Sequence, residues 1–320
     1  MKKLVSVMSI LFLITLMIYS KSNMEAVKQG LDLWVNTVIP SLFPFFIATE
    51  ILCCTNLVSV LGKILYKPIH KIFGVPGEGA FAFIMGIISG YPSGAKIVSE
   101  LKAQEILTQE ESERLIAFTN NAGPLFILGT VGISLLQNSK IGYILLISHL
   151  ISCILVGIVF RNWKKESNQI FSRKYFHRKV PSQDFGEILS NSIQKAIDTI
   201  MMIGGFIVFF SVFLSILQSS GFFSVIGFLF EKIGIKKDFG NAICSGIIEL
   251  TNGVKKICCF KITKIHIAWI SFLIGFGGFS VLFQVHSILN KAKISIKPYL
   301  YGKILQACFS FLITWFLINL

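Results

Sequence analysis

The sequence predicts an all-α polytopic membrane protein built from two structural repeats, each with a re-entrant helical hairpin and a broken transmembrane helix. Three observations lead to this fold class. The composition is too apolar for a soluble globule, glycine- and proline-rich breaks interrupt apolar runs in the first half, and similar breaks recur roughly 155 to 160 residues later. We expect the two repeats to be inverted relative to each other in the membrane.

The composition indicates a chain that lies mostly in lipid. Of 320 residues, 53% are hydrophobic and 14% are charged, and the mean hydropathy is +0.72, which leaves too little charge to cover a soluble domain. The net charge of +14 falls mostly in short segments between apolar runs, where it would meet anionic lipid headgroups. No separate basic domain exists, so we expect no nucleic-acid partner. The seven cysteines lack Cys-x-x-Cys spacing and are interpreted as reduced packing residues.

Residues 1–22 form the first predicted element. A basic start and an apolar stretch predict an N-terminal transmembrane segment, with an uncleaved signal sequence as the alternative. The first repeat is placed at residues 24–160. It begins with an amphipathic lead-in at residues 24–39 and a span at residues 41–54 that contains Glu50. This carboxylate is expected either to face a cavity or to lie near a lipid headgroup.

A short basic connection at residues 63–71 leads into a predicted re-entrant hairpin. Residues 79–89 are apolar but only roughly 16 Å long as a helix, about half a bilayer. They stop at a Ser-Gly-Tyr-Pro-Ser-Gly turn, before a second helix at residues 95–106. Freed backbone amides find no water inside a bilayer, so such a break is expected only where it is buried in protein or faces a wet cavity. The hairpin tip is therefore a candidate binding site.

The next predicted element is a broken span. Thr108 and Glu111 have the spacing of a capping box and so predict a helix start. That helix is interrupted at residues 120–124, Asn-Asn-Ala-Gly-Pro, because proline lacks an amide proton and disfavours helical geometry at the preceding residue. It resumes over residues 125–136, and a further span at residues 141–160 completes the repeat.

A basic segment separates the two repeats. Residues 161–184 are rich in lysine and arginine and are predicted to be a cytoplasmic linker. The second repeat, residues 185–320, is predicted to contain a lead-in, a span, a short apolar piece with a turn, a broken span and a final span. These lie at residues 185–198, 199–217, 241–250 with the turn at 251–253, 266–274 and 279–290 around a break at 275–278, and 299–320.

Two alignments between the halves support the prediction of repeats. Residues 86–96 pair with residues 246–255, and residues 122–124 pair with residues 277–279, at nearly the same offset. If the first span takes the chain out, the first repeat starts outside and ends inside, so the second starts on the opposite face. The lysines at residues 232–264 would then lie outside, against the usual positive-inside bias.

The breaks are predicted to bind a small anionic solute. At each break the following half-helix would begin with free amides and the positive end of its dipole, with Lys96 and Lys255 just beyond in matching positions. Tyr91 could stack on a ring, and Glu249 could carry a coupling proton or cation. The alternative is that polar residues at these crossings only satisfy one another, as they do between membrane helices. The candidate substrate-binding residues are Ser89, Gly90, Tyr91, Ser93, Gly94, Lys96, Asn120, Asn121, Glu249, Thr251, Asn252, Lys255, Gly277, Gly278 and Ser280.

The remaining polar groups indicate no enzyme. His149 and Gln284 are single polar residues within spans and are expected to be hydrogen-bonded packing residues. The sequence has no His-Glu-x-x-His, no carboxylate pair at metal spacing and no phosphate-binding glycine loop. Ser93 lacks the Gly-x-Ser-x-Gly spacing of a serine hydrolase. We therefore expect no catalytic residues, no metal site and no cofactor, apart from the coupling proton or cation.

Three motifs carry a resemblance to a known family. Residues 86–96 (Gly-Ile-Ile-Ser-Gly-Tyr-Pro-Ser-Gly-Ala-Lys), 119–124 (Thr-Asn-Asn-Ala-Gly-Pro) and 40–46 (Pro-Ser-Leu-Phe-Pro-Phe-Phe) resemble the sporulation integral membrane proteins of the YlbJ type, in the nucleoside-recognition or Gate domain family. That family is similar to concentrative nucleoside transporters, which have paired re-entrant hairpins and broken helices. The resemblance implies passage of dipicolinate across the outer forespore membrane. The second half diverges, with Glu-Leu-Thr-Asn-Gly at residues 249–253 in place of the proline-containing turn.

The function that we expect is therefore that of a membrane permease for a small anionic heteroaromatic solute, with dipicolinate as the solute that the resemblance implies. The alternatives are a non-transporting membrane scaffold needed for spore envelope assembly, motivated by the basic segment at residues 161–184, and a nucleoside-type transporter. The other expected partner is the lipid bilayer, and an oligomer is compatible with the sequence.

Overall fold

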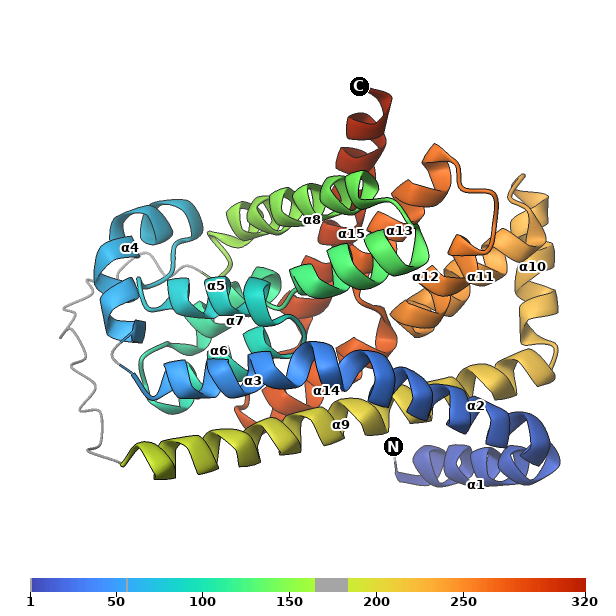
Figure 1. The fold of residues 1–320 in the computed structure, drawn as a ribbon, viewed down its shortest axis with the longest axis horizontal. Coiled ribbons are helices and arrows are strands. Elements are labelled where there is room, and N and C mark those ends of the chain that lie inside the picture. Colours follow the sequence, from blue (N-terminus) through green and yellow to red (C-terminus); the bar gives the residue numbers. More distant parts are fainter. Residues whose placement is uncertain (1, 56, 165–183) are drawn as a thin grey trace.

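The computed structural model describes residues 2–55, 57–164 and 184–320, and every regular element within them is a helix (Figure 1). The helices form an elongated bundle. Four are long and apolar enough to cross a membrane: α8 (Ser139–Phe160), α9 (Phe185–Ser219), the stretch Lys264–Lys291 and α15 (Lys297–Asn319). A fifth span is formed if the bent pair Ser9–Ile18 and Ser20–Asn36 is counted as one. The basic linker predicted at residues 161–184 falls largely outside the described residues.

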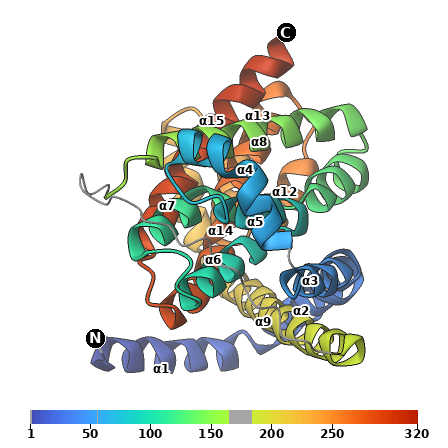
Figure 2. The ribbon, with the colours of Figure 1, turned by 90° about the vertical axis from the view of Figure 1, so that its left-hand side faces the viewer.

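The N-terminal helix α1 (Lys2–Ile18) leaves the bundle. The two helices of the bent pair meet at an angle of 100°, so α1 extends away from its neighbours (Figure 2). Apolar side chains such as Leu11, Met17 and Ile18 are exposed. An apolar helix that packs on so little protein suits a lipid environment, and the assignment of residues 1–22 to a membrane segment or an uncleaved signal stays a prediction.

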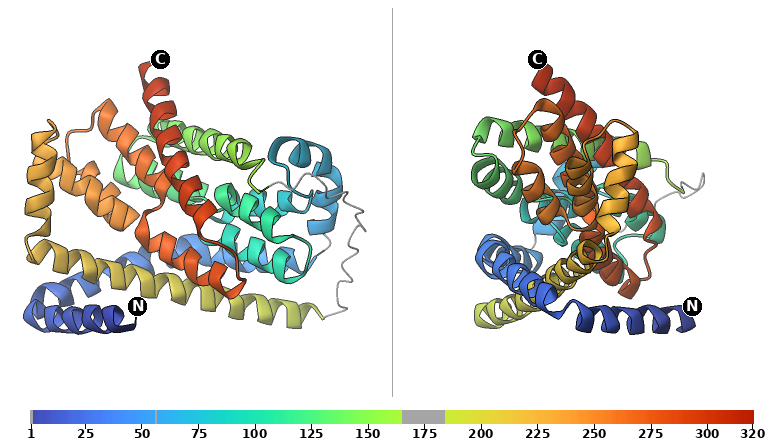
Figure 3. Two further views of the ribbon diagram at one scale, coloured as in Figure 1. Left: turned by 180° about the vertical axis from the view of Figure 1, so that it is seen from behind. Right: turned by 90° about the vertical axis from the view of Figure 1, so that its right-hand side faces the viewer.

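Two long helices pack side by side in opposite directions. The first is continuous through α2 (Ser20–Leu33), the wider π-type turn η1 (Trp34–Val38) and α3 (Ile39–Cys53); the second is α9. Trp34 lies over Gly204 and donates from Nε1 to the carbonyl of Ile200 at 3.0 Å. Figures 1 and 3 show the antiparallel pair along one side of the bundle.

The predicted division of each long helix into an interfacial lead-in and a separate span was therefore wrong. In the first half, Pro40 and Pro44 lie inside the continuous helix, and the wider π-type turn directly before α3 lets the helix continue past Pro40. In the second half, α9 runs without a break over 35 residues. Such a helix is roughly 52 Å long at about 1.5 Å per residue, longer than a bilayer core of about 30 Å.

A short helix and a helical hairpin follow each long helix. In the first half these are α4 (Leu57–Phe73), α5 (Gly79–Ser89) and α6 (Ser93–Ala103), and in the second half α10 (Phe222–Lys232), α11 (Lys237–Ile248) and α12 (Leu250–Cys258). The predicted connection at residues 63–71 is thus part of a helix. The arms of each hairpin touch at a glycine pair: Gly86 lies against Gly94, and Gly246 against Gly253. A Cβ on Gly86 or Gly94 would meet the Thr119 carbonyl. One on Gly253 would meet the Gly246 backbone, and one on Gly246 would meet the Leu273 side chain, so close packing at these positions requires glycine.

A broken helix and one further helix complete each half. The first broken helix is α7 (Gln109–Thr119) and the π-type stretch η2 (Leu125–Leu135), followed by α8; the second is α13 (Lys264–Phe276) and α14 (Gly278–Lys291), followed by α15. The capping box at Thr108 and Glu111 is confirmed, with the Glu111 amide 3.2 Å from Thr108 Oγ1. The second break is narrower than predicted, because Gly277 alone separates α13 from α14, at φ +85°. The order of elements is the same in both halves.

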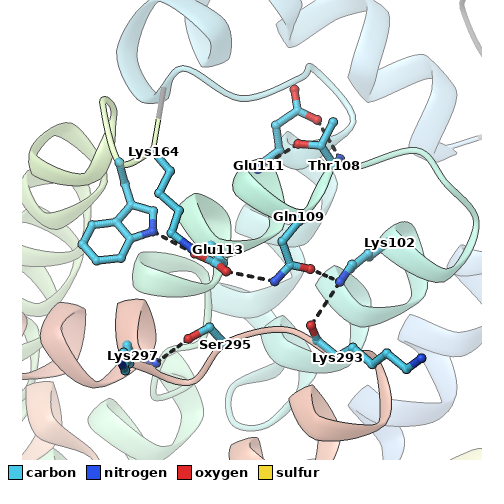
Figure 4. Close-up of polar contacts among 10 residues, drawn as sticks. Lys102, Thr108, Gln109, Glu111, Glu113, Lys164, Lys293, Ser295 and Lys297 are labelled. Carbon is cyan, nitrogen blue, oxygen red and sulfur yellow. Dashed lines mark hydrogen bonds and ion pairs between the residues drawn. The ribbon is translucent and has the colours of Figure 1, made fainter. Parts of the chain in front are cut away.

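A polar cluster ties the base of the first hairpin to its neighbours near residue 161 (Figure 4). Lys102 at the end of α6 donates to Gln109 and to the carbonyl of Ala292, and Gln109 donates to Glu113. The Glu113 carboxylate also accepts from the Trp163 indole at 2.9 Å and pairs with Lys164 at 3.0 Å. The first hairpin, the first broken helix and the connection between α14 and α15 are thereby joined at this end.

Candidate solute site between the two hairpin tips

One cavity of about 100 Å³ lies where the two hairpin tips meet the first helix break and the start of α14, just after the second break. Gly90 and Tyr91 come from the first tip, and Glu249 and Thr251 from the second. The long helices close the other side with apolar side chains. The complete lining is Leu33, Val38, Leu42, Gly90, Tyr91, Ala122, Gly123, Phe126, Thr130, Ile203, Ile207, Glu249, Leu250, Thr251, Ser280, Val281 and Gln284. An apolar wall with a few convergent polar groups is typical of a small-molecule site.

The first tip turns at Gly90, whose φ of +78° suits glycine alone among the common residues. Helix α6 starts two residues after Tyr91, and the amides of Ser93 and Ala95 in its first turn donate to acceptors within the protein. The Ala95 amide donates to Asn120 Oδ1 at 3.3 Å, and the Ser93 amide donates to the Gly90 carbonyl at 2.9 Å. Asn120, from the first helix break, therefore acts as a cap on the hairpin.

The second tip carries its own cap. The Glu249 carboxylate accepts from the Thr251 amide at 3.2 Å and from the Asn252 amide at 2.8 Å, at the start of α12. A carboxylate in this place is stabilised by the free amides and by the helix dipole. The predicted stop at residues 251–253 was wrong by two residues, because Glu249 is the break and these residues lie inside α12.

The prediction of free amides waiting for an anion is corrected at both tips. At the first tip the Ala95 amide donates to the Asn120 side chain and the Ser93 amide to the Gly90 carbonyl, and at the second tip the Glu249 carboxyl group accepts from two amides. Sequence reasoning assumed that a broken helix leaves its first amides open, whereas buried amides need partners even in the absence of a solute. The Glu249 carboxyl group is therefore part of the cavity wall.

The predicted site residues divide into three groups in the structure. Gly90, Tyr91, Glu249, Thr251 and Ser280 line the cavity. A second group supports the wall from behind: Ser89, Ser93, Gly94, Asn120, Asn121, Gly277 and Gly278. Three residues lie elsewhere. Lys96 pairs with Glu50, Asn252 lines a different cavity, and Lys255 is exposed on α12.

The glycines and Ser89 show how the supporting group works. Ser89 Oγ is 2.6 Å from Thr49 Oγ1, which joins the first hairpin to α3. A Cβ on Gly277 would lie 2.9 Å from the Tyr91 hydroxyl, and one on Gly278 would lie 3.1 Å from the Leu250 amide. The second break thus touches both tips, and its glycines allow that approach.

Several polar residues near the cavity were missed or misjudged from the sequence. Gln284, expected to be a packing residue, lines the cavity, with Nε2 3.5 Å from Ser280 Oγ. The ring nitrogens of His149 are buried and have no hydrogen-bond partner among the residues that the structure describes, so the expectation that this histidine is hydrogen-bonded was wrong. Lys303 on α15 was not singled out at all, although it is fully buried and donates to the Tyr91 hydroxyl at 3.2 Å. The sequence contains a pattern that could have identified it, because polar residues recur at helical spacing in this apolar span: Lys303, Gln306, Ser310 and Thr314.

Two further cavities continue the site along α9. One of about 440 Å³ lies nearer residue 184, between α6, α9 and α14, and is lined by Lys96, Lys195 and Asp198 among others. The other, of about 290 Å³, lies between α2, α9 and α12 and is lined mostly by serine, glutamine and charged side chains. Within the part of the chain that the structure describes, no three His, Cys, Asp or Glu side chains gather as metal ligands would.

Comparisons with known proteins agree with this architecture. No family model matches the chain. The sporulation integral membrane protein YlbJ of Bacillus subtilis (strain 168) is 33% identical, over 92% of this chain and 78% of its own length. The chain belongs to the YlbJ family of sporulation integral membrane proteins. The YlbJ resemblance predicted from the three motifs is thereby confirmed, and the chain is an integral, multi-pass membrane protein.

Solved structures show the fold class of this YlbJ-family chain. Two structures of variants of the concentrative nucleoside transporter CNTnw, both in an outward-facing state, superpose with TM-scores of 0.55 and 0.51. They cover 100% and 98% of this chain and 84% and 87% of the transporter. At 12% identity the likeness concerns the fold alone. The protein is an all-helical membrane protein with the fold of a concentrative nucleoside transporter.

Proposed function

We propose that this YlbJ-family protein is a permease that moves a small solute past the two hairpin tips. The observation that carries the proposal is a cavity lined by both hairpin tips, by the first helix break and by the start of α14, which follows the second break. Irregular backbone inside a membrane is tolerated where it lines such a cavity, and secondary transporters place their substrates at broken helices near the bilayer midplane. Packing alone would satisfy one break, but it would not require both hairpin tips and the first break to face the same space.

The three cavities along α9 outline a route for the solute. Successive stretches of α9 line them in order, from Lys195 and Thr199, through Ile203 and Ile207, to Ser219. This stretch of helix is roughly 36 Å long at about 1.5 Å per residue, enough to cross a hydrocarbon core of about 30 Å. The central cavity is the smallest and most apolar part of the route, which suits a point where the solute is enclosed.

We further propose that the halves are inverted repeats, residues 24–160 and 185–320. Two features support this. The long helices run in opposite directions, and the hairpins start from opposite ends of the bundle. The first hairpin starts beside residue 161, because Gly74 lies against the Arg161 backbone, whereas the second follows the far end of α9 at Ser219. Inverted repeats allow one site to open alternately to the two sides.

The proposed solute is dipicolinate, and the proposed location is the outer forespore membrane. Family membership with a sporulation protein supports both. The cavity offers hydroxyl donors from Thr251 and Ser280 and an aromatic side chain, Tyr91, for a planar ring. Glu249 favours a second candidate, a neutral solute of the nucleoside type, because a carboxylate repels a dianion and accepts hydrogen bonds from sugar hydroxyls.

Uptake by the purified chain in proteoliposomes tests the proposal and separates the two solutes. We expect labelled dipicolinate to enter faster than in empty liposomes, and Thr251→Val with Ser280→Ala to slow entry at least tenfold. Glu249→Gln keeps an acceptor for the helix cap and removes the charge, so it should speed dipicolinate entry and slow uridine entry. If neither solute enters liposomes that contain folded protein, the permease proposal is refuted and the scaffold alternative remains.

A further inference from the structure

Lys303 is a fully buried lysine inside a membrane-spanning helix. It lies on α15 with 0% of its surface exposed, and its ammonium donates to Gln306 Oε1 at 2.8 Å and to the Tyr91 hydroxyl at 3.2 Å. Among the described residues, Lys303 forms no ion pair with any carboxylate. An ammonium in this position cannot reach the lipid headgroups, so its charge has to be offset by the protein around it.

The groups around the ammonium are all neutral and electron-rich. Besides the two oxygens, the faces of two tyrosine rings lie near it, with the Tyr91 centroid at 4.9 Å and the Tyr299 centroid at 5.7 Å. Hydroxyl and amide oxygens together with aromatic faces form an environment that stabilises a cation. The titratable groups that face the ammonium are Tyr91 at the first hairpin tip, Tyr299 on its own helix α15, and His149 and Cys153 on α8.

The neutral groups around the ammonium are hydrogen-bonded in turn to residues at or next to the two helix breaks. Gln306 donates to Asn121 Oδ1 at 2.8 Å, and Asn120 donates to the Tyr299 hydroxyl at 3.2 Å, both in the first break. The Tyr91 hydroxyl lies 3.3 Å from the Ile274 carbonyl, in the last turn before the second break. The ammonium is therefore the centre of a network that joins the first hairpin tip to both breaks.

The helix ends at this junction carry negative partial charge. Helices α7 and α13 both finish here, and the last carbonyls of a helix have no partner within it. In secondary transporters, such carbonyl ends of broken helices coordinate an exchangeable Na⁺ or H⁺. In this protein the ammonium of Lys303, which is part of the chain, lies near the carbonyl ends of α7 and α13.

We propose that Lys303 is a built-in cation, which takes the part of an exchangeable coupling cation at the crossing of the two breaks. It is a positioning residue: through the Tyr91 hydroxyl it holds the first hairpin tip against the cavity. Solute movement by this protein accordingly requires no Na⁺. This inference rests on the proposed permease function and assigns to it a residue and a cation dependence.

Chemical rescue of a truncated side chain tests the inference. In proteoliposomes, wild-type uptake of dipicolinate is expected to change less than twofold when Na⁺ is replaced by choline. Lys303→Ala should lower uptake at least tenfold, and propylammonium, which has the three carbons and the amine that the substitution removes, should restore a third or more of it. Tetramethylammonium at the same concentration should restore none, because it has no N–H to donate. Lys297→Ala, on the exposed start of the same helix, is the matched control.

Lys303→Met keeps the packing volume without the charge and so guards against a variant that simply fails to fold. Wild-type uptake that needs Na⁺, full activity of Lys303→Met, or a Lys303→Ala variant that no alkylammonium rescues would each overturn the inference. If the wild type transports no solute, thermal unfolding decides instead. The Tm of Lys303→Ala should rise with the propylammonium concentration and reach a plateau, while the wild-type Tm should not change with Na⁺. If the Tm of the variant does not change with propylammonium, the built-in cation is overturned, and this result does not depend on whether the protein is a permease.

Discussion

The ion-pair cluster of Glu50, Lys96 and Lys195 should hold the first hairpin against the two long helices. Lys96 on α6 pairs with Glu50 on α3, and Lys195 on α9 lies 3.3 Å from the same carboxylate. The side chain of Glu50 is 6% exposed, that of Lys96 25% and that of Lys195 53%. Lys96 and Lys195 line the 440 Å³ cavity, and through Glu50 they join the first hairpin to both long helices, so separation of the hairpin has to break the cluster.

The magnitude follows from distance and exposure. At 3.3 Å and an effective dielectric constant of about 20, the attraction between Glu50 and Lys195 is roughly 5 kcal/mol before solvent screening. Because Lys195 is half exposed, about 1 kcal/mol remains, and the less exposed Lys96 contributes a similar or larger amount. Glu50→Gln should therefore favour the open hairpin by about 2 kcal/mol, which corresponds to about 30-fold in the population of the open form.

Hydrogen exchange measures that population directly. The amides of α6 should exchange about 30-fold faster in Glu50→Gln than in the wild type. Glu231→Gln removes an exposed carboxylate from α10 and serves as the control, with α6 exchange unchanged. Exchange of α6 within twofold of the wild type would refute the reasoning, and so would additive effects of Glu50→Gln and Lys96→Met in a double-mutant cycle.

Three further predictions concern packing, capping and the cluster near residue 161. Gly86→Ala places a methyl group against the Thr119 carbonyl and should cost more than about 2 kcal/mol, whereas Gly205→Ala meets nothing within 4 Å and should keep or raise the Tm; equal Tm values would contradict the hairpin packing. Glu249→Ala should cost about 1 kcal/mol through the lost cap and Glu249→Gln less, as measured by thermal unfolding, and the reverse order would contradict the cap. Glu113→Gln weakens the hydrogen bond that the Trp163 indole donates and should shift the wavelength of tryptophan fluorescence emission. An unchanged emission spectrum would contradict this hydrogen bond.

The breaks were predictable because their causes are local. A glycine with positive φ, such as Gly90 or Gly277, and a proline that lacks an amide proton interrupt a helix whatever surrounds them. The capping box at Thr108 is equally local, since its two residues are three positions apart. These short-range rules were enough to place both hairpins and both broken helices to within a few residues.

The chemistry of the site was less predictable because it depends on partners far away in the chain. Asn120 caps a helix that starts 27 positions before it, at Ser93, and Lys303 meets Tyr91 across more than 200 residues. No local pattern pairs those residues. The Glu249 cap is the exception, because it binds amides two and three residues later and so follows a recognisable rule for helix starts.

The two hairpin tips differ in charge, and this difference gives the cavity a direction. At the first tip a neutral amide, from Asn120, satisfies the start of α6, and the ammonium of Lys303 lies directly behind Tyr91. At the second tip the Glu249 carboxyl group satisfies the start of α12 and lines the cavity itself. We expect a solute bound between the tips, as proposed, to meet the dipoles of Tyr91 and Lys303 on one side and the acceptor oxygens of Glu249 on the other, and in an apolar enclosure such fields are weakly screened. An elongated polar solute would accordingly enter in one orientation, with its electron-rich end toward Tyr91 and its hydrogen-bond donors toward Glu249.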